Sequence, residues 1–97
     1  MRTYAVLWNF TAQGIQNVKD SANRLRAFQE EAEKKNVKIR EFLWTMGEYD
    51  GMIVLEAPDD TTVASLMLAT GALGNIRSKS FRGFVKEEIK ELLEAIG

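Results

Sequence analysis

Hydrophobic and polar positions repeat along this chain at a strand period in some stretches and at a helix period in others. In Thr3–Phe10 nearly every position is apolar, so the alternation is weak. A strand with one wet face alternates clearly, because neighbouring side chains point to opposite faces. The pattern therefore predicts a strand buried on both sides. One face would carry Tyr4, Val6, Trp8 and Phe10, and the other Ala5 and Leu7.

Two further strands in the middle of the chain form a predicted hairpin. Its arms are Val37–Met46 and Met52–Ala57, and the second arm is apolar on both faces except for Glu56. The connection Gly47–Gly51 has a glycine at each end, and glycine adopts the positive φ angles that tight turns use. One face of the first arm would carry Phe42, Trp44 and Met46, and the other Glu41, Leu43 and Thr45.

Three longer stretches have apolar residues at helical spacing. They predict helices over Ala22–Lys35, Asp59–Leu73 and Lys86–Ile96, with a last strand over Asn75–Phe84. Thr11 would cap a short helical turn, Asp20 or Ser21 the first long helix, and Asp59 and Asp60 would open the second. Asn36, Gly71 and Gly74 would act as stops. The inward stripes would be Ala22, Leu25, Phe28 and Ala32; Val63, Leu66, Met67 and Leu73; and Ile89, Leu92, Leu93 and Ile96.

The resulting order is strand, helix, strand, strand, helix, strand and one extra helix. This is the split βαβ, ferredoxin-like pattern of an α+β protein. Right-handed crossovers give a four-stranded antiparallel sheet of order 4-1-3-2. The two central strands are then the two that are apolar on both faces. The two edge strands carry charges such as Lys38, Arg40, Arg77 and Lys79, which edges use against aggregation.

Several short motifs resemble the GYD-domain family of small bacterial and archaeal proteins. They comprise Gly47-x-Tyr49-Asp50 with Trp44-Thr45 before it, Glu56–Asp60, Asn9–Thr11, Gln13-Gly14, Lys19–Ser21 and Gly74–Arg77. The resemblance runs over essentially the whole chain, and the ordered set carries it rather than any single motif. It implies a ferredoxin-like fold of the dimeric α+β barrel type. It implies no settled activity.

Two helices can cover only one face of the predicted sheet. The other face would expose Trp, Tyr, Val or Met side chains, and monomers rarely expose a large apolar patch. We therefore expect a second copy to cover it in a homodimer or higher homo-oligomer, sheet against sheet. The alternative is that the terminal helix folds under and covers this face alone.

The amino-acid composition limits the kinds of chemistry that this chain is expected to perform. The chain has 97 residues, a formal net charge of −1, no cysteine and no histidine. We expect one domain over residues 1–97, with no metal site, no cofactor and no nucleic-acid partner. No apolar run approaches the roughly 20 residues that cross a bilayer, and no signal peptide is recognisable. A cytoplasmic protein is the expectation.

Polar and aromatic residues gather near the predicted strand ends and supply a candidate ligand site. Its members are Trp8, Asn9, Trp44, Tyr49, Asp50, Asn75 and Arg77, with Thr11, Lys19, Asp20 and Arg24 nearby. A pocket lined by Trp8, Trp44 and Tyr49, with Asn9 and Arg77 as anchors, would suit a small anionic or carbonyl ligand. Each residue also has a structural interpretation. The tryptophans suit a core or interface, Asp50 suits a turn, and Arg77 could pair with Asp20 or Glu48.

The sequence leaves three functions open. The first is a homo-oligomeric module that binds or senses a small molecule. The second is a cofactor-independent monooxygenase or isomerase acting on a small organic substrate, which the resemblance alone suggests. The third is a structural module for protein interaction.

Overall fold

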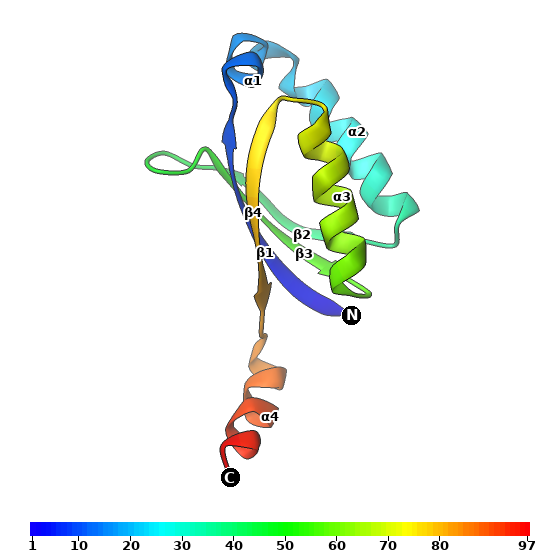
Figure 1. Cartoon of the computed structure of the whole chain (residues 1–97), viewed down its shortest axis with the longest axis vertical. Coiled ribbons are helices and arrows are strands. Elements are labelled where there is room, and N and C mark those ends of the chain that lie inside the picture. The colour runs from blue at the N-terminus through cyan, green and yellow to red at the C-terminus, as the bar shows by residue number, and fades with distance from the viewer.

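The computed structural model describes residues 1–97 and contains a four-stranded antiparallel sheet with helices on one face (Figure 1). The elements are β1 (Arg2–Phe10), α1 (Ala12–Gln16), the 3-10 turn η1 (Val18–Asp20), α2 (Ser21–Lys34), β2 (Lys38–Trp44), β3 (Gly51–Ala57), α3 (Asp60–Ala72), β4 (Ile76–Gly83) and α4 (Lys86–Ile96). This order confirms the α+β, ferredoxin-like prediction.

The sheet order is β2-β3-β1-β4, which is the predicted 4-1-3-2 arrangement. β1 lies between β3 and β4 and is antiparallel to both, with Tyr4 opposite Leu55 on one side and Arg82 on the other. β2 and β4 form the edges. The two strands that are apolar on both faces, β1 and β3, are therefore central, where each is paired along both edges and α2 and α3 cover one face.

The core lies between the sheet and the pair α2 and α3. Strand side chains that point toward these helices are buried, among them Tyr4, Val6, Trp8, Ile53 and Leu55. Phe28 and Ala32 of α2 and Val63, Leu66 and Met67 of α3 pack onto them.

The prediction that Trp and Tyr side chains lie on the uncovered face is wrong. The larger alternating set of β1 faces the helices, because the wide rings fill the space between sheet and helices. The uncovered surface is called here the open sheet face. It carries the other alternating set of β1, which has smaller side chains, and the residues of β2, β3 and β4 that point to the same side. Its apolar members are Ala5, Leu7, Leu43, Met52, Val54 and Phe81.

A bulge in β2 brings one more apolar side chain to the covered face. Ile39 is opposite Leu55, yet Glu41 is opposite Val54, so Arg40 is an extra residue in the strand. An extra residue reverses the alternation that follows it. Ile39 and Phe42 therefore both pack against the core, although three positions separate them.

Most of the helix caps and stops are at the residues that the sequence predicts. Thr11 accepts a hydrogen bond from the Gly14 backbone N–H, and Asp59 accepts one from that of Thr62. Asn36 has φ 58°, as expected for a left-handed stop. Gly74, with φ 86°, follows the end of α3, whereas Gly71 lies inside that helix.

Some inward positions were predicted wrongly. Leu73 caps the C-terminus of α3 and is 67% exposed, so it lies outside the buried core, although it lines the cavity described below. Ala22 is exposed in the first turn of α2. Met46 lies beyond the end of β2 and is exposed, because the Thr45 N–H bonds to the Asp50 carbonyl and closes the turn there.

Helix α4 has the predicted bounds but extends away from the sheet. Figure 1 shows it beyond the end of β4, far from α2 and α3. The radius of gyration is 14.6 Å. A compact chain of this length has about 12.5 Å by the usual scaling. The projection of α4 accounts for the 51 Å long axis, so α4 does not cover the open sheet face of its own chain.

Candidate functional site

A cavity of about 210 Å³ lies between the sheet and the two long helices. Its sheet side is formed by Trp8, Phe10, Phe42, Trp44, Ile53 and Ile76. Its helix side includes Leu25, Ala27 and Phe28 of α2 and Leu66, Ala69 and Thr70 of α3. Because most of these side chains are apolar, the cavity suits a ligand whose surface is mainly hydrocarbon.

Aromatic rings form the sheet side of the cavity. Trp8 and Phe10 meet edge to face with centroids 5.0 Å apart, and Phe10 and Trp44 do so at 5.6 Å. The centroids of the Phe42 and Trp8 rings are 6.2 Å apart. Edge-to-face contacts are favourable for aromatic pairs and fix the ring orientations. The wall is therefore a preformed aromatic surface.

Trp8 carries the one buried side-chain nitrogen that lacks a partner. The residue is 4% exposed, and its Nε1 makes no hydrogen bond. Its ring lies against Gly51, where a Cβ atom would come within 2.1 Å of the indole. An unsatisfied buried donor costs about 1–3 kcal/mol. The atom itself is inaccessible to solvent and packs against Gly51, so the ring rather than its N–H faces the cavity.

Arg24 is the cation among the residues that line this cavity. Its guanidinium donates to the backbone oxygens of Asn17 at 2.8 Å and Gly14 at 3.3 Å, and to Ser21 Oγ at 3.0 Å. No carboxylate pairs with it. Glu31 also lines the cavity and lies 3.8 Å from Lys34. A held guanidinium without a counterion suits an anionic ligand group.

The predicted site residues divide between three places. Trp8, Trp44 and Asn75 line the cavity. Asn9 and Arg77 are opposite each other in the β1–β4 ladder, one position from Trp8 and from Ile76, and so belong to the other side of the sheet. Neither predicted ion pair of Arg77 forms. A ligand role for these two residues stays a prediction.

Asp50 and Tyr49 belong to the hairpin turn. Asp50 Oδ2 accepts the Phe10 N–H at 2.9 Å, and the Asp50 N–H donates to Asn9 Oδ1 at 3.0 Å. These bonds tie the turn to the end of β1, as the structural interpretation of Asp50 predicts. The Lys79 ammonium lies 5.9 Å from the centre of the Tyr49 ring. Neither residue lines the cavity.

Apart from Arg24, the helix residues of the cavity were not predicted as site residues, because the candidates were chosen by nearness to strand ends and to the start of the first long helix. Leu25 and Phe28 were predicted to face the sheet, and that inward stripe was the available signal. Asn75 is held in the wall because the connection before β4 is tied to α1. Its carbonyl accepts the Thr11 N–H at 3.1 Å, while Thr11 Oγ1 donates to the Gly74 carbonyl at 2.5 Å.

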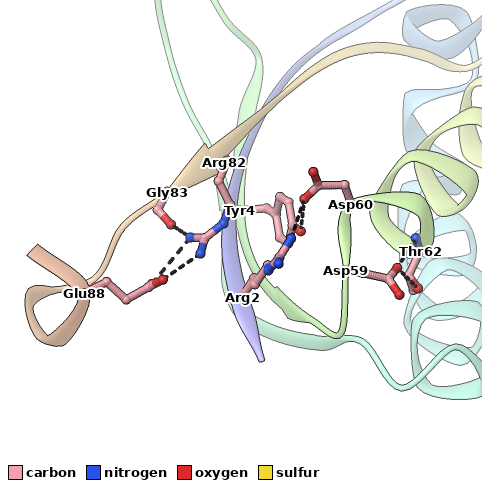
Figure 2. Close-up of polar contacts among 8 residues, drawn as sticks. All are labelled: Arg2, Tyr4, Asp59, Asp60, Thr62, Arg82, Gly83 and Glu88. Carbon is pink, nitrogen blue, oxygen red and sulfur yellow. Dashed lines mark hydrogen bonds and ion pairs between the residues drawn. The ribbon is translucent and has the colours of Figure 1, made fainter. Parts of the chain in front are cut away.

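A second polar cluster lies at the opposite end of β1 (Figure 2). The Tyr4 hydroxyl donates to Asp60 Oδ1 at 2.5 Å, and Arg2 lies 3.6 Å from the same oxygen. Burial, and then the bond to Asp60, raise the pKa of Tyr4, which keeps the phenol protonated. The Thr62 hydroxyl and backbone N–H lower the pKa of Asp59. These contacts fix β1 to the start of α3 and give no general base.

Arg82 joins the end of β4 to α4 in the same region. Its Nη2 lies 2.6 Å from Glu88 Oε2, and it also donates to the Gly83 carbonyl (Figure 2). Its guanidinium lies 4.5 Å from the centre of the Phe84 ring. The hydrogen bond from Arg82 lowers the pKa of Glu88, and the Glu88 contact raises the pKa of Arg82.

Acid should remove this Arg82–Glu88 pair. A carboxylate with a lowered folded-state pKa stabilises the fold above its unfolded pKa, about 4.3, and that contribution is lost as the pH falls through the folded pKa. Glu88→Gln should therefore lower the melting temperature at pH 7, and the difference from the unchanged protein should shrink as the pH falls below about 4. Glu87→Gln, which removes an unpaired carboxylate, is the control. Equal pH profiles for both variants would contradict this assignment.

The architecture and the cavity together define a small ferredoxin-like α+β protein with an aromatic internal site. The model of the GYD domain matches residues 4–93, so the chain belongs to the GYD-domain family. No curated protein matches the chain in sequence. No helix in the structure is long and apolar enough to cross a membrane.

Solved structures share the fold at low sequence identity. MtbAldR matches with a TM-score of 0.60 and 12% identity, over 88% of this chain and 52% of its own. The C-terminal domain of the MgtC protein from Mycobacterium tuberculosis matches with a TM-score of 0.59 and 9% identity, over 86% and 88% of the two chains. A protein from Galdieria sulphuraria matches with a TM-score of 0.53 and 16% identity, over 87% and 46%. This chain spans about half the length of MtbAldR, and the likeness concerns the fold alone.

Proposed function

We propose that this chain is a binding module for a small organic molecule, held in the cavity between the sheet and helices α2 and α3. A mainly apolar cavity with a preformed aromatic wall, and with the unpaired Arg24 among its lining residues, carries the proposal. A dry apolar cavity of about 150 Å³ holds benzene in another protein. The volume of about 210 Å³ therefore suits a molecule with one ring or a chain of similar size.

The side chains that line the cavity limit the kinds of ligand that would fit it. The aromatic rings of the wall favour a ligand with a ring or a hydrocarbon body. Arg24 adds a positive charge with no carboxylate partner in the chain. A small aromatic or alicyclic carboxylate would satisfy both. This anchor replaces Arg77, which lies outside the cavity.

Binding is favoured over catalysis by the location of the groups with displaced pKa values. Tyr4, Asp59, Arg82 and Glu88 have such shifts, and none of them lines the cavity. Catalytic acids and bases commonly have pKa values moved by their site. The groups with displaced pKa values therefore give no support to a catalytic site in this cavity.

We also propose that the module works as a homo-oligomer. The open sheet face carries six apolar side chains and is covered by no helix of its own chain. A second copy is the simplest cover, because a two-fold contact buries the same surface twice.

Ligand binding can be measured through the protein's own fluorescence. The chain has two tryptophans, and both line the cavity. Benzoate and cyclohexanecarboxylate should change this fluorescence and raise the melting temperature, since a ligand at 100 times its Kd stabilises by about 2.7 kcal/mol. Benzyl alcohol, which lacks the charge, should bind more weakly.

Two variants locate the site. Ala69→Phe places a ring in the cavity wall and should abolish the response, whereas Ala64→Phe, in the same helix but outside the cavity, should leave it unchanged. Arg24→Gln removes the positive charge and should weaken binding of the two carboxylates roughly 10-fold or more, because hydrogen bonds to charged groups contribute about 1.5–3 kcal/mol. No response to any of the three compounds, or full binding by Ala69→Phe, would refute the proposal.

A further inference from the structure

Helix α4 presents an apolar stripe that nothing in its own chain covers. Val85, Ile89, Leu92 and Ile96 follow at intervals of three and four residues, and Leu93 lies beside them. All five are exposed, and Ile96 is 80% exposed. An amphipathic helix of this length gains most of its stability by packing the apolar stripe against another surface.

The direction of α4 is fixed by contacts at its base. Glu88 receives a hydrogen bond from Arg82 Nη2 at 2.6 Å (Figure 2). It also receives one from the Val85 backbone N–H at 3.3 Å. The same guanidinium lies over the Phe84 ring and bonds the Gly83 carbonyl. Of these contacts, only the Arg82–Glu88 pair joins the strand to the helix, and it would have to break for α4 to fold back onto its own sheet. This pair favours the projecting position.

The open sheet face offers apolar rows of matching character. Leu43, Met52 and Leu7 are consecutive neighbours across three strands, and so are Val54, Ala5 and Phe81. These two rows lie side by side, because their members are two positions apart along each strand. They form an apolar strip over the middle of the sheet, with Glu41 at its end on β2 and Lys79 at its end on β4.

Charge distinguishes this face from a generic apolar surface. Arg77 and Lys79 lie along β4 on the open side and take part in no ion pair. Helix α4 has two lysines and four glutamates, a net charge of −2, and only Glu88 is paired. An acidic helix with an apolar stripe complements an apolar strip with a basic edge.

We infer that α4 of one copy packs its apolar stripe on the open sheet face of a second copy, with its free glutamates near Arg77 and Lys79 of the partner. By two-fold symmetry each copy would give and receive one helix. Both halves of the contact are present in one chain yet cannot meet within it. The inference rests on the proposed association of two copies and adds the element that makes the contact.

Cross-linking tests this contact, since the chain has no cysteine of its own. Leu92→Cys on α4 and Val54→Cys on the open sheet face are mixed and treated with a short bismaleimide. A cross-linked Leu92→Cys/Val54→Cys heterodimer is expected. Leu68→Cys, on an exposed part of α3, mixed with Val54→Cys is the matched control and should give none.

Sedimentation of full-length protein supplies the second readout. The protein should be a dimer at micromolar concentration, and Leu92→Glu with Ile96→Glu should weaken the dimer at least 100-fold while leaving circular dichroism unchanged. Leu68→Glu should not weaken it. A monomer would overturn both the association and the helix contact. A dimer that cross-links only Val54→Cys to itself, or only Leu92→Cys to itself, would overturn the helix contact and leave the association standing.

Discussion

Leu55→Ala is expected to lower the free energy of unfolding by about 2–5 kcal/mol, the range for removing a buried leucine side chain. Leu55 lies in the middle of β3 and is fully buried between the sheet neighbours Tyr4 and Ile39 and the helices above. The truncation removes apolar burial and leaves a cavity that close-packed neighbours cannot fill. The whole free energy of unfolding of a native protein is about 5–15 kcal/mol, so this loss is a large share of it.

Leu68→Ala is the matched control for this core variant. Leu68 is 75% exposed on α3, and alanine has the higher helix propensity. Its free energy of unfolding should stay within about 0.5 kcal/mol of the unchanged protein, as surface substitutions do. Urea unfolding followed by circular dichroism measures both variants. Similar losses in both would mean that the covered face of the sheet is assigned wrongly.

Gly14→Ala is expected to destabilise by about 1–3 kcal/mol or more, as overpacking does. A Cβ atom at Gly14 would lie 1.9 Å from the Asn75 carbonyl oxygen, and a backbone atom cannot rotate away. The change would push α1 from the start of β4. It would thereby strain the Thr11 bonds to Gly74 and Asn75, which hold one wall of the cavity. Ligand binding should fall with stability.

Gly71→Ala should have the opposite sign. Gly71 lies inside α3, and nothing stands within 4 Å of a Cβ placed there. Replacing glycine by alanine in a helix interior gains roughly 0.5–1 kcal/mol, because alanine loses less backbone freedom on folding. The pair of variants therefore separates the steric effect from the effect of glycine itself. Stabilisation by both would show that α1 and β4 are not in close contact at Gly14.

The strand-like alternation and the helical spacing of apolar residues predict most of the fold. They give every long element and the sheet order, because strands that are apolar on both faces must be central. They fail at β2, where the bulge at Arg40 reverses the alternation. No pattern in the sequence marks that extra residue, since it depends on pairing with β3.

The candidate site was predictable in part. Alternation alone puts Asn9 on the face opposite Trp8, so nearness to a strand end was the weaker guide. The side of the sheet on which Tyr49 lies could not be predicted, because side chains in a turn do not alternate regularly between the two faces. The contribution of Arg24 depends on how α2 crosses the sheet, and crossing geometry arises from packing rather than from spacing.

The pairing of β1 with both β3 and β4 has a consequence for synthesis on the ribosome. The first strand made is a central strand, and its two neighbours begin only at Gly51 and Ile76. Until β4 emerges, one margin of the nascent sheet has unsatisfied backbone groups that can recruit other chains. Chains truncated before β4 should therefore be the species most prone to self-association during translation.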